Sequence, residues 1–139
     1  VLLFSSMAVA DDISDFQIEG ISIGDSLLEY FSEEEINAPN KYYFRDNKFI
    51  GILIWQHSSF KVYDGVSFVY KPNTNYKIHS ISGSLNYKNN IKDCYNKQDE
   101  IVSEISNLFK NISNKKYVGN YPADETGNSK STNVEFNLK

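Results

Sequence analysis

Apolar residues first recur at helical spacing in the segment between Ser22 and Pro39. Ser22 and Asp25 are spaced as the two partners of a capping box, in which each side chain binds the other residue's backbone N–H at the start of a helix. Ser32 and Glu35 repeat this spacing. The pattern predicts two short helical segments before Pro39. The apolar positions that share the first helical face are Ile23, Leu27, Leu28 and Phe31.

The following segments have the residue pattern of extended strands. Residues 41–44 and 49–55 flank Asp46–Asn47, a residue pair typical of a hairpin turn. The segment 49–55 is apolar at nearly every position, whereas a strand with one solvent-facing side would alternate. We therefore predict a hairpin whose second strand lies in the centre of a sheet and is covered on both faces.

Two further strands are predicted on either side of a turn at Pro72–Asn75. Residues 66–71 alternate, with large apolar side chains on one face. Within 76–87 the apolar side chains change from even to odd positions. This change predicts a bulge near His79 and Ser80, because one extra residue moves the following side chains to the other face.

The longest periodic segment covers residues 91–112 and follows Asn90, a residue type that caps helices. Its apolar side chains form one stripe, with charged and amide side chains on the other face, so we expect an amphipathic helix packed on a sheet. Residues 113–132 are polar and predict a long loop, and residues 133–139 alternate as a returning strand. The stripe consists of Ile91, Cys94, Tyr95, Ile101, Val102, Ile105, Leu108, Phe109 and Ile112.

These elements predict an α+β fold. We expect an antiparallel sheet of about four to five strands, a short N-terminal helix, and one long amphipathic helix packed on one face of the sheet. The chain has 139 residues, a length typical of one domain, and we place that domain at residues 11–139.

The first ten residues differ from the rest. Val1–Met7 is apolar or small, and Ala8–Val9–Ala10 provides small residues at both key positions of an A-x-A cleavage site before Asp11. We interpret residues 1–10 as the C-terminal part of a secretory signal peptide, with a buried N-terminal strand as the alternative. The protein is then expected in the periplasm or outside the cell. A membrane-spanning helix needs about 20 apolar residues, and we predict none in the mature chain.

Composition excludes some functions. The chain is 40% hydrophobic and 14% aromatic, enough for a core, and its net charge is −4. Nucleic-acid binding needs clustered basic residues, so we predict no nucleic-acid partner. Arg45 is the only arginine, which disfavours sites built on bidentate contacts to phosphate or carboxylate groups.

Cys94 is the only cysteine. In an exported protein an unpaired cysteine indicates an intermolecular disulfide, a free thiol, or a partner outside the printed sequence. The alternative is a small buried apolar residue on the long helix. Residues 1–10 are interpreted as the end of a signal peptide and the strand at 133–139 stops without a turn, so we expect the printed sequence to be a fragment at both ends.

Few residues of the sequence fit a catalytic pattern. His57 and His79 are the only histidines, and neither belongs to a metal-binding motif. The sequence has no nucleophile elbow, P-loop or dinucleotide-binding motif, and we predict no metal or cofactor. A small hydrolase that uses His57 or His79 would need that histidine to meet a Ser, Asp or Glu in a concave site.

Tyrosines on the predicted strands suggest a binding function instead. Rings on a sheet face can hold a protein, peptide or glycan by stacking and main-chain pairing. The alternative is that these rings are ordinary core or cross-strand pairs. The candidate binding surface consists of Tyr70, Tyr76, His79 and Tyr87.

Three segments, 16–36, 69–109 and 121–138, resemble a group of uncharacterised secreted proteins of marine bacteria with A/T-rich genomes. Members of that group continue beyond the point where this sequence stops, into a strand with a second cysteine. The resemblance therefore implies a disulfide for Cys94.

The shorter segment 20–31, GISIGDSLLEYF, resembles the first helix of the SmpA/OmlA-type outer-membrane assembly lipoproteins. That resemblance implies an accessory role in envelope assembly. We expect an exported, non-enzymatic binding or interaction domain, with envelope assembly or a small hydrolase as alternatives.

Overall fold

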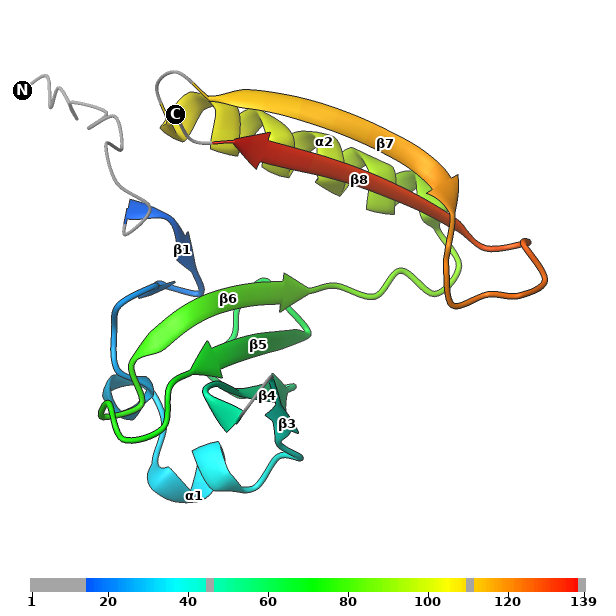
Figure 1. Cartoon of the computed structure of the whole chain (residues 1–139). Coiled ribbons are helices and arrows are strands. Elements are labelled where there is room, and N and C mark those ends of the chain that lie inside the picture. The colour runs from blue at the N-terminus through cyan, green and yellow to red at the C-terminus, as the bar shows by residue number, and fades with distance from the viewer. Residues whose placement is uncertain (1–14, 45–46, 110–111, 138–139) are drawn as a thin grey trace, which may run out of the picture. The chain divides into compact units, whose positions relative to one another are not determined.

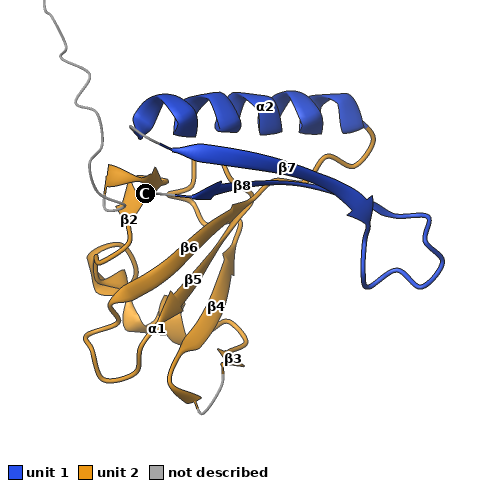
Figure 2. Cartoon of the chain, turned by 45° about the horizontal axis from the view of Figure 1, so that its top comes forward, with its two compact units in different colours: residues 1–11, 90–139 blue, residues 12–89 orange. Residues whose placement is uncertain are grey.

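The computed structural model describes residues 15–44, 47–109 and 112–137 (Figure 1). The chain forms two compact units, residues 12–89 and residues 90–139 with 1–11 (Figure 2). The single domain predicted at residues 11–139 stays a prediction, and each unit is described by itself. The predicted signal peptide at residues 1–10 lies outside the described residues.

The unit 12–89 begins with a small hairpin of β1 (Gln17–Ile18) and β2 (Ile21–Ser22). Its two turn residues, Glu19 and Gly20, both have positive φ, 55° and 78°. A two-residue turn of this kind matches the twist of the flanking strands. It also places Glu19 at the tip of the hairpin.

The Glu19 carboxylate binds the loop between β4 and β5. It accepts hydrogen bonds from the backbone N–H groups of Lys61 at 2.8 Å, Val62 at 2.7 Å and Tyr63 at 2.7 Å. Burial would raise the pKa of the Glu19 carboxyl, but these hydrogen bonds outweigh it and the pKa is lowered. One side chain therefore holds three successive residues of a long loop.

The two predicted helical segments are present but shorter than a regular helix. Ser32 caps α1 (Glu33–Asn37) in a complete capping box with Glu35, as predicted. The prediction for Ser22 is wrong, because Ser22 lies in β2 and the helical turn η2 (Leu27–Glu29) is capped by Ser26. Ser22 still donates its backbone N–H to the Asp25 carboxylate at 2.9 Å, which is half of the predicted box.

A four-stranded antiparallel sheet forms the centre of this unit, in the order β3-β4-β5-β6. The predicted hairpin is confirmed by the pairing of β3 with β4, although Asp46 in its turn lies outside the described residues. The strands are β3 (Tyr42–Tyr43), β4 (Ile50–Trp55), β5 (Gly65–Tyr70) and β6 (Ile78–Ser84).

The predicted bulge in β6 is confirmed. Tyr70 pairs with Ile78 and Val69 pairs with Ser80, so His79 is an extra residue in the ladder. Ile78 and Ile81 are three positions apart and would face opposite sides of a regular strand. Because of the bulge, they share one face.

The core lies on that face of the sheet. Cross-strand neighbours there include Ile52 opposite Phe68 and Ile54 opposite Val66, and all four are buried. The N-terminal elements of the same unit complete the core with Ile18, Ile21, Leu27, Phe31 and Ile36. β4 is central, as predicted, but its two faces are not equally covered, since Trp55 is 43% exposed.

The second unit contains α2 (Ile91–Leu108), β7 (Ser113–Asn120) and β8 (Lys130–Asn137). Asn90 caps α2 as predicted, accepting the N–H of Asp93 at 3.2 Å. The helix runs along the β7–β8 ribbon (Figure 1), and Gln98 Nε2 donates to the Thr132 carbonyl at 2.9 Å.

The predicted long loop at 113–132 is wrong. Its first part forms β7, which pairs with β8 along eight residues from Ser113↔Asn137 to Asn120↔Lys130. All of β7 is exposed, so its polar residues give no burial pattern by which a strand could be recognised. Over the residues that the structure describes, the fold is α+β, as predicted, with antiparallel sheets of two, four and two strands and one long helix.

Candidate functional site

A hollow of about 280 Å³ opens in the unit 12–89, between the end of α1 and the turn that joins β5 to β6. It lies at the end of the core face of the sheet, where Ile50 and Tyr70 are cross-strand neighbours. The lining residues are Asn37, Lys41, Ile50, Tyr70, Lys71, Pro72, Asn73, Asn75 and Tyr76.

Two tyrosine rings form the aromatic part of the hollow. Tyr70 is 3% exposed, whereas Tyr76 is half-buried, and their ring centroids lie 5.4 Å apart at 47°. Burial, followed by the nearby Tyr76 and Tyr43, raises the pKa of Tyr70, so its phenol stays neutral. A neutral phenol can both donate and accept a hydrogen bond.

The turn that carries Tyr76 has an unusual backbone. Asn73, Asn75 and Tyr76 have φ of 62°, 53° and 54°. Asparagine tolerates this left-handed region, but a bulky residue such as tyrosine adopts it rarely. Strained backbone of this kind is concentrated at functional sites and needs support from its surroundings.

Residues at the start of η2 supply that support. The Leu27 N–H donates to the Tyr76 carbonyl at 3.1 Å, and Ser26 Oγ donates to the Asn75 carbonyl at 2.7 Å. The two segments that these bonds join are distant in the sequence, since Ser26 and Asn75 are 49 residues apart. The backbone of the turn at Asn75 and Tyr76 is therefore held by residues at the start of η2.

The polar part of the hollow is cationic. Lys41 Nζ donates to Asn37 Oδ1 at 2.7 Å, and Lys71 is exposed beside Pro72. Within this described lining no residue is acidic, although the whole chain carries a net charge of −4. The hollow thus has the opposite sign of charge from the protein as a whole.

The structure brings together only part of the predicted binding surface. Tyr70 and Tyr76 line the hollow, whereas His79 is exposed in the bulge with its ring 5.3 Å from that of Phe49. Tyr87 follows the opposite end of β6. The residue pattern does not identify the lysines and asparagines of the lining as site residues. Asn73 and Asn75 fit the predicted turn, whereas Lys41 and Lys71 belong to predicted strands.

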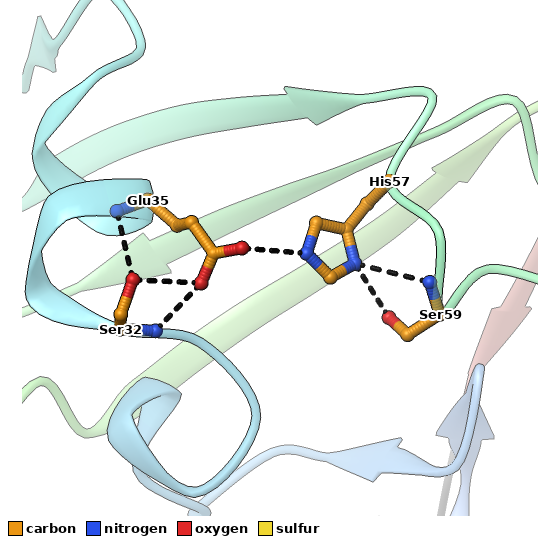
Figure 3. Close-up of polar contacts among 4 residues, drawn as sticks. All are labelled: Ser32, Glu35, His57 and Ser59. Carbon is orange, nitrogen blue, oxygen red and sulfur yellow. Dashed lines mark hydrogen bonds and ion pairs between the residues drawn. The ribbon is translucent and has the colours of Figure 1, made fainter.

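A second polar cluster joins α1 to the loop after β4 (Figure 3). His57 Nε2 lies 3.0 Å from Glu35 Oε1, and His57 Nδ1 lies 2.7 Å from Ser59 Oγ. The backbone N–H of Ser59 also donates to Nδ1 at 3.2 Å. We assign the hydrogen of the neutral ring to Nε2, because Nδ1 accepts from Ser59.

The Glu35 carboxylate is stabilised in its charged form. The backbone N–H of Ser32 contributes most, followed by hydrogen bonds from His57 and the Ser32 hydroxyl, and together they lower the pKa of Glu35 to about 2. The His57 ring packs against Phe31 and Phe60, with centroids 5.1 Å and 5.4 Å away. The residue pattern indicates His57 as a candidate but does not identify Glu35 or Ser59 as its partners.

Other candidate features fall outside these two clusters. Cys94 is half-buried on α2 with a free thiol, and its disulfide stays a prediction. Among the described residues no group of His, Cys, Asp and Glu side chains is arranged to hold a metal ion. The helices in this part of the chain are too short or too polar to cross a membrane.

Comparisons with protein-family models, with curated proteins and with solved structures find no match for this chain.

Proposed function

We propose that the protein is an exported, non-enzymatic binding domain whose ligand occupies the hollow beside Tyr70 and Tyr76. The observation that carries this proposal is the strained turn, in which Tyr76 has φ of 54° and its carbonyl accepts a hydrogen bond from the Leu27 N–H. Such a conformation persists only where the surrounding structure holds it, and it is concentrated at ligand clamps and other functional sites. Export rests on the signal-like sequence of residues 1–10.

The composition of the hollow supports a ligand site. Small-molecule sites combine apolar or aromatic walls with a few polar groups that fix the ligand. Here Tyr70 and Tyr76 provide rings, and amide and ammonium groups provide donors. The volume of about 280 Å³ lies close to the lower limit of about 300 Å³ for such sites, which favours a small ligand or one residue of a longer one.

Substituting Tyr76 with asparagine is expected to weaken binding by up to about tenfold, because an aromatic contact contributes roughly 0.5–1.5 kcal/mol beyond the area that it buries. Asparagine tolerates a positive φ, so Tyr76→Asn removes the ring without disturbing the turn. Saturation-transfer NMR with a panel of short saccharides and tripeptides measures binding. Tyr87→Asn, at the other end of β6, is the matched control. Equal binding by the two variants would contradict the proposal.

A second candidate function is ester hydrolysis at Ser59, favoured by the arrangement of Ser59, His57 and Glu35. In this reaction Ser59 Oγ attacks the carbonyl carbon of an ester and its proton passes to His57 Nδ1. The Glu35 carboxylate at Nε2 stabilises the resulting imidazolium. The proton then passes to the departing alcohol, and water hydrolyses the acyl-serine in the same way.

Hydrolysis predicts that a fluorophosphonate probe labels Ser59, because His57 activates its hydroxyl. His57→Gln is expected to slow labelling about 100-fold or more, the usual contribution of a general base. Peptide mass spectrometry locates the label, and Ser58→Ala is the neighbouring control. Labelling that is unchanged in His57→Gln, or that occurs at another serine, would exclude this candidate and leave His57 as a structural link.

A further inference from the structure

We infer that the hollow beside Tyr76 recognises an anionic saccharide, a sugar residue that carries a carboxylate or sulfate group. This inference rests on the proposed binding function and specifies its ligand. It combines three properties of the lining: its positive charge, its amide groups, and the pairing of the strands around it.

The charge of the lining favours an anion. Lys41 and Lys71 are its charged residues, and no acidic side chain of the described lining offsets them. In a chain of net charge −4, such a local excess of positive charge attracts anionic ligands through complementarity rather than through overall charge. Lysine ammonium groups act as point charges and suit a carboxylate or sulfate without the bidentate geometry of arginine.

The amide groups favour a ligand with several hydroxyls. Asn37, Asn73 and Asn75 line the hollow, and an amide carries both donors and acceptors, which matches a sugar hydroxyl because that group also donates and accepts. The Asn37 amide already binds the Glu33 carbonyl and Lys41 Nζ, so we assign the ligand contacts to Asn73 and Asn75. The half-buried ring of Tyr76 offers an apolar surface to the C–H face of a sugar. Tyr70 is almost fully buried and tilted by 47° to Tyr76, so the two rings do not form a slot for a flat aromatic base.

The strand pairing disfavours an extended peptide. A peptide gains affinity at a sheet by pairing its backbone with an open strand edge. At the hollow, Ile50 is already paired with Tyr43 and Tyr70, and Tyr70 is also paired with Ile78. The strands that line the hollow therefore have both edges occupied, and recognition there depends on side chains.

The test compares digalacturonate with its dimethyl ester, which has the same rings without the charges, by isothermal titration calorimetry on the full chain. We expect the acid to bind at least about tenfold more tightly, because charge complementarity discriminates between them. Raising the ionic strength from about 0.01 M to about 1 M shortens the screening length from roughly 30 Å to roughly 3 Å and should weaken binding of the acid. A sulfated galactose disaccharide that binds in place of the uronic acid also supports the inference.

Variants link the binding to the hollow. Lys71→Gln should lose the preference for the acid over the ester, whereas Lys88→Gln, an exposed lysine outside the lining, should keep it. Equal binding of the acid and the ester to the wild type would overturn the inference. The proposed function would still stand if Tyr76→Asn abolished binding of both compounds. Failure of both anionic saccharides to bind would overturn the inference. The proposed function would then be decided separately, by whether Tyr76→Asn weakens binding of the tripeptides or the neutral saccharides.

Discussion

Replacing Phe68 with alanine is expected to lower the free energy of unfolding of the unit 12–89 by about 3–5 kcal/mol. The Phe68 side chain is fully buried in the centre of β5, with the Phe31 ring 5.5 Å away. Removing it leaves a cavity that the strands on either side cannot close without breaking their pairing. Urea denaturation followed by the fluorescence of Trp55, the only tryptophan, measures the loss.

The matched control is Phe44→Ala. Phe44 is 48% exposed, so its removal should cost about 1 kcal/mol or less, since exposed positions contribute little. If the two variants lost similar stability, Phe68 would not lie in the core that the structure describes.

Substituting Glu19 with glutamine is expected to cost about 3 kcal/mol at neutral pH, because each charge-assisted hydrogen bond contributes roughly 1.5–3 kcal/mol. The uncharged amide weakens the bonds that Oε1 accepts from Val62 and Tyr63, and its NH₂ group opposes the Lys61 N–H at the Oε2 position. The change should also loosen the loop at 61–63, since the carboxylate is bound to each of its residues. Urea denaturation and hydrogen exchange of these three amides measure the two effects.

The cost of Glu19→Gln should depend on pH. The pKa of Glu19 is lower in the folded protein than its ordinary value of 4.5, so the stabilisation is present above the ordinary value and is lost as the pH falls through the folded pKa. The difference between wild type and variant should therefore shrink in acid. Glu33→Gln, an exposed residue in the first turn of α1, is the control. A difference that did not change with pH would contradict the role of the carboxylate.

The sequence predicts those elements whose defining residues lie close together along the chain. The capping box of Ser32 and Glu35 was predicted correctly because both residues of the motif lie within one turn of helix. The bulge at His79 was also predictable, since a change in the positions of buried side chains along one strand requires an extra residue.

The elements that the sequence did not predict depend on pairing between distant residues. β7 is exposed along its whole length, and its partner begins ten residues after it ends. Backbone hydrogen bonds stabilise a ribbon of this kind. Because these bonds require no particular side chains, the residue types do not reveal the pairing. The spacing of Ser22 to Asp25 predicts a helix cap, although the strand pairing of Ser22 with Gln17 decides its conformation.

The candidate sites were predictable only in part for the same reason. Tyr70 and Tyr76 are predicted as rings on strands. Asn37 and Lys41, in contrast, belong to the end of α1 and the segment that follows it, and only the fold places them at the hollow. Likewise, Glu35 and His57 are separated by 22 residues, and only the fold brings the carboxylate to the ring. A single sequence shows which residue types are present but not which of them lie close together in the folded chain.

The bulge in β6 has a consequence for the comparison of related sequences. The residues on either side of His79 already pair correctly with Tyr70 and Val69, so a strand without this residue would form an uninterrupted ladder with Ile78 and Ile81 on the same face. Position 79 is therefore where a relative can lack one residue and keep the same core. A one-residue gap elsewhere in β6 would turn the following side chains to the opposite face of the sheet. A gap at position 79 would instead mean that the relative lacks the bulge.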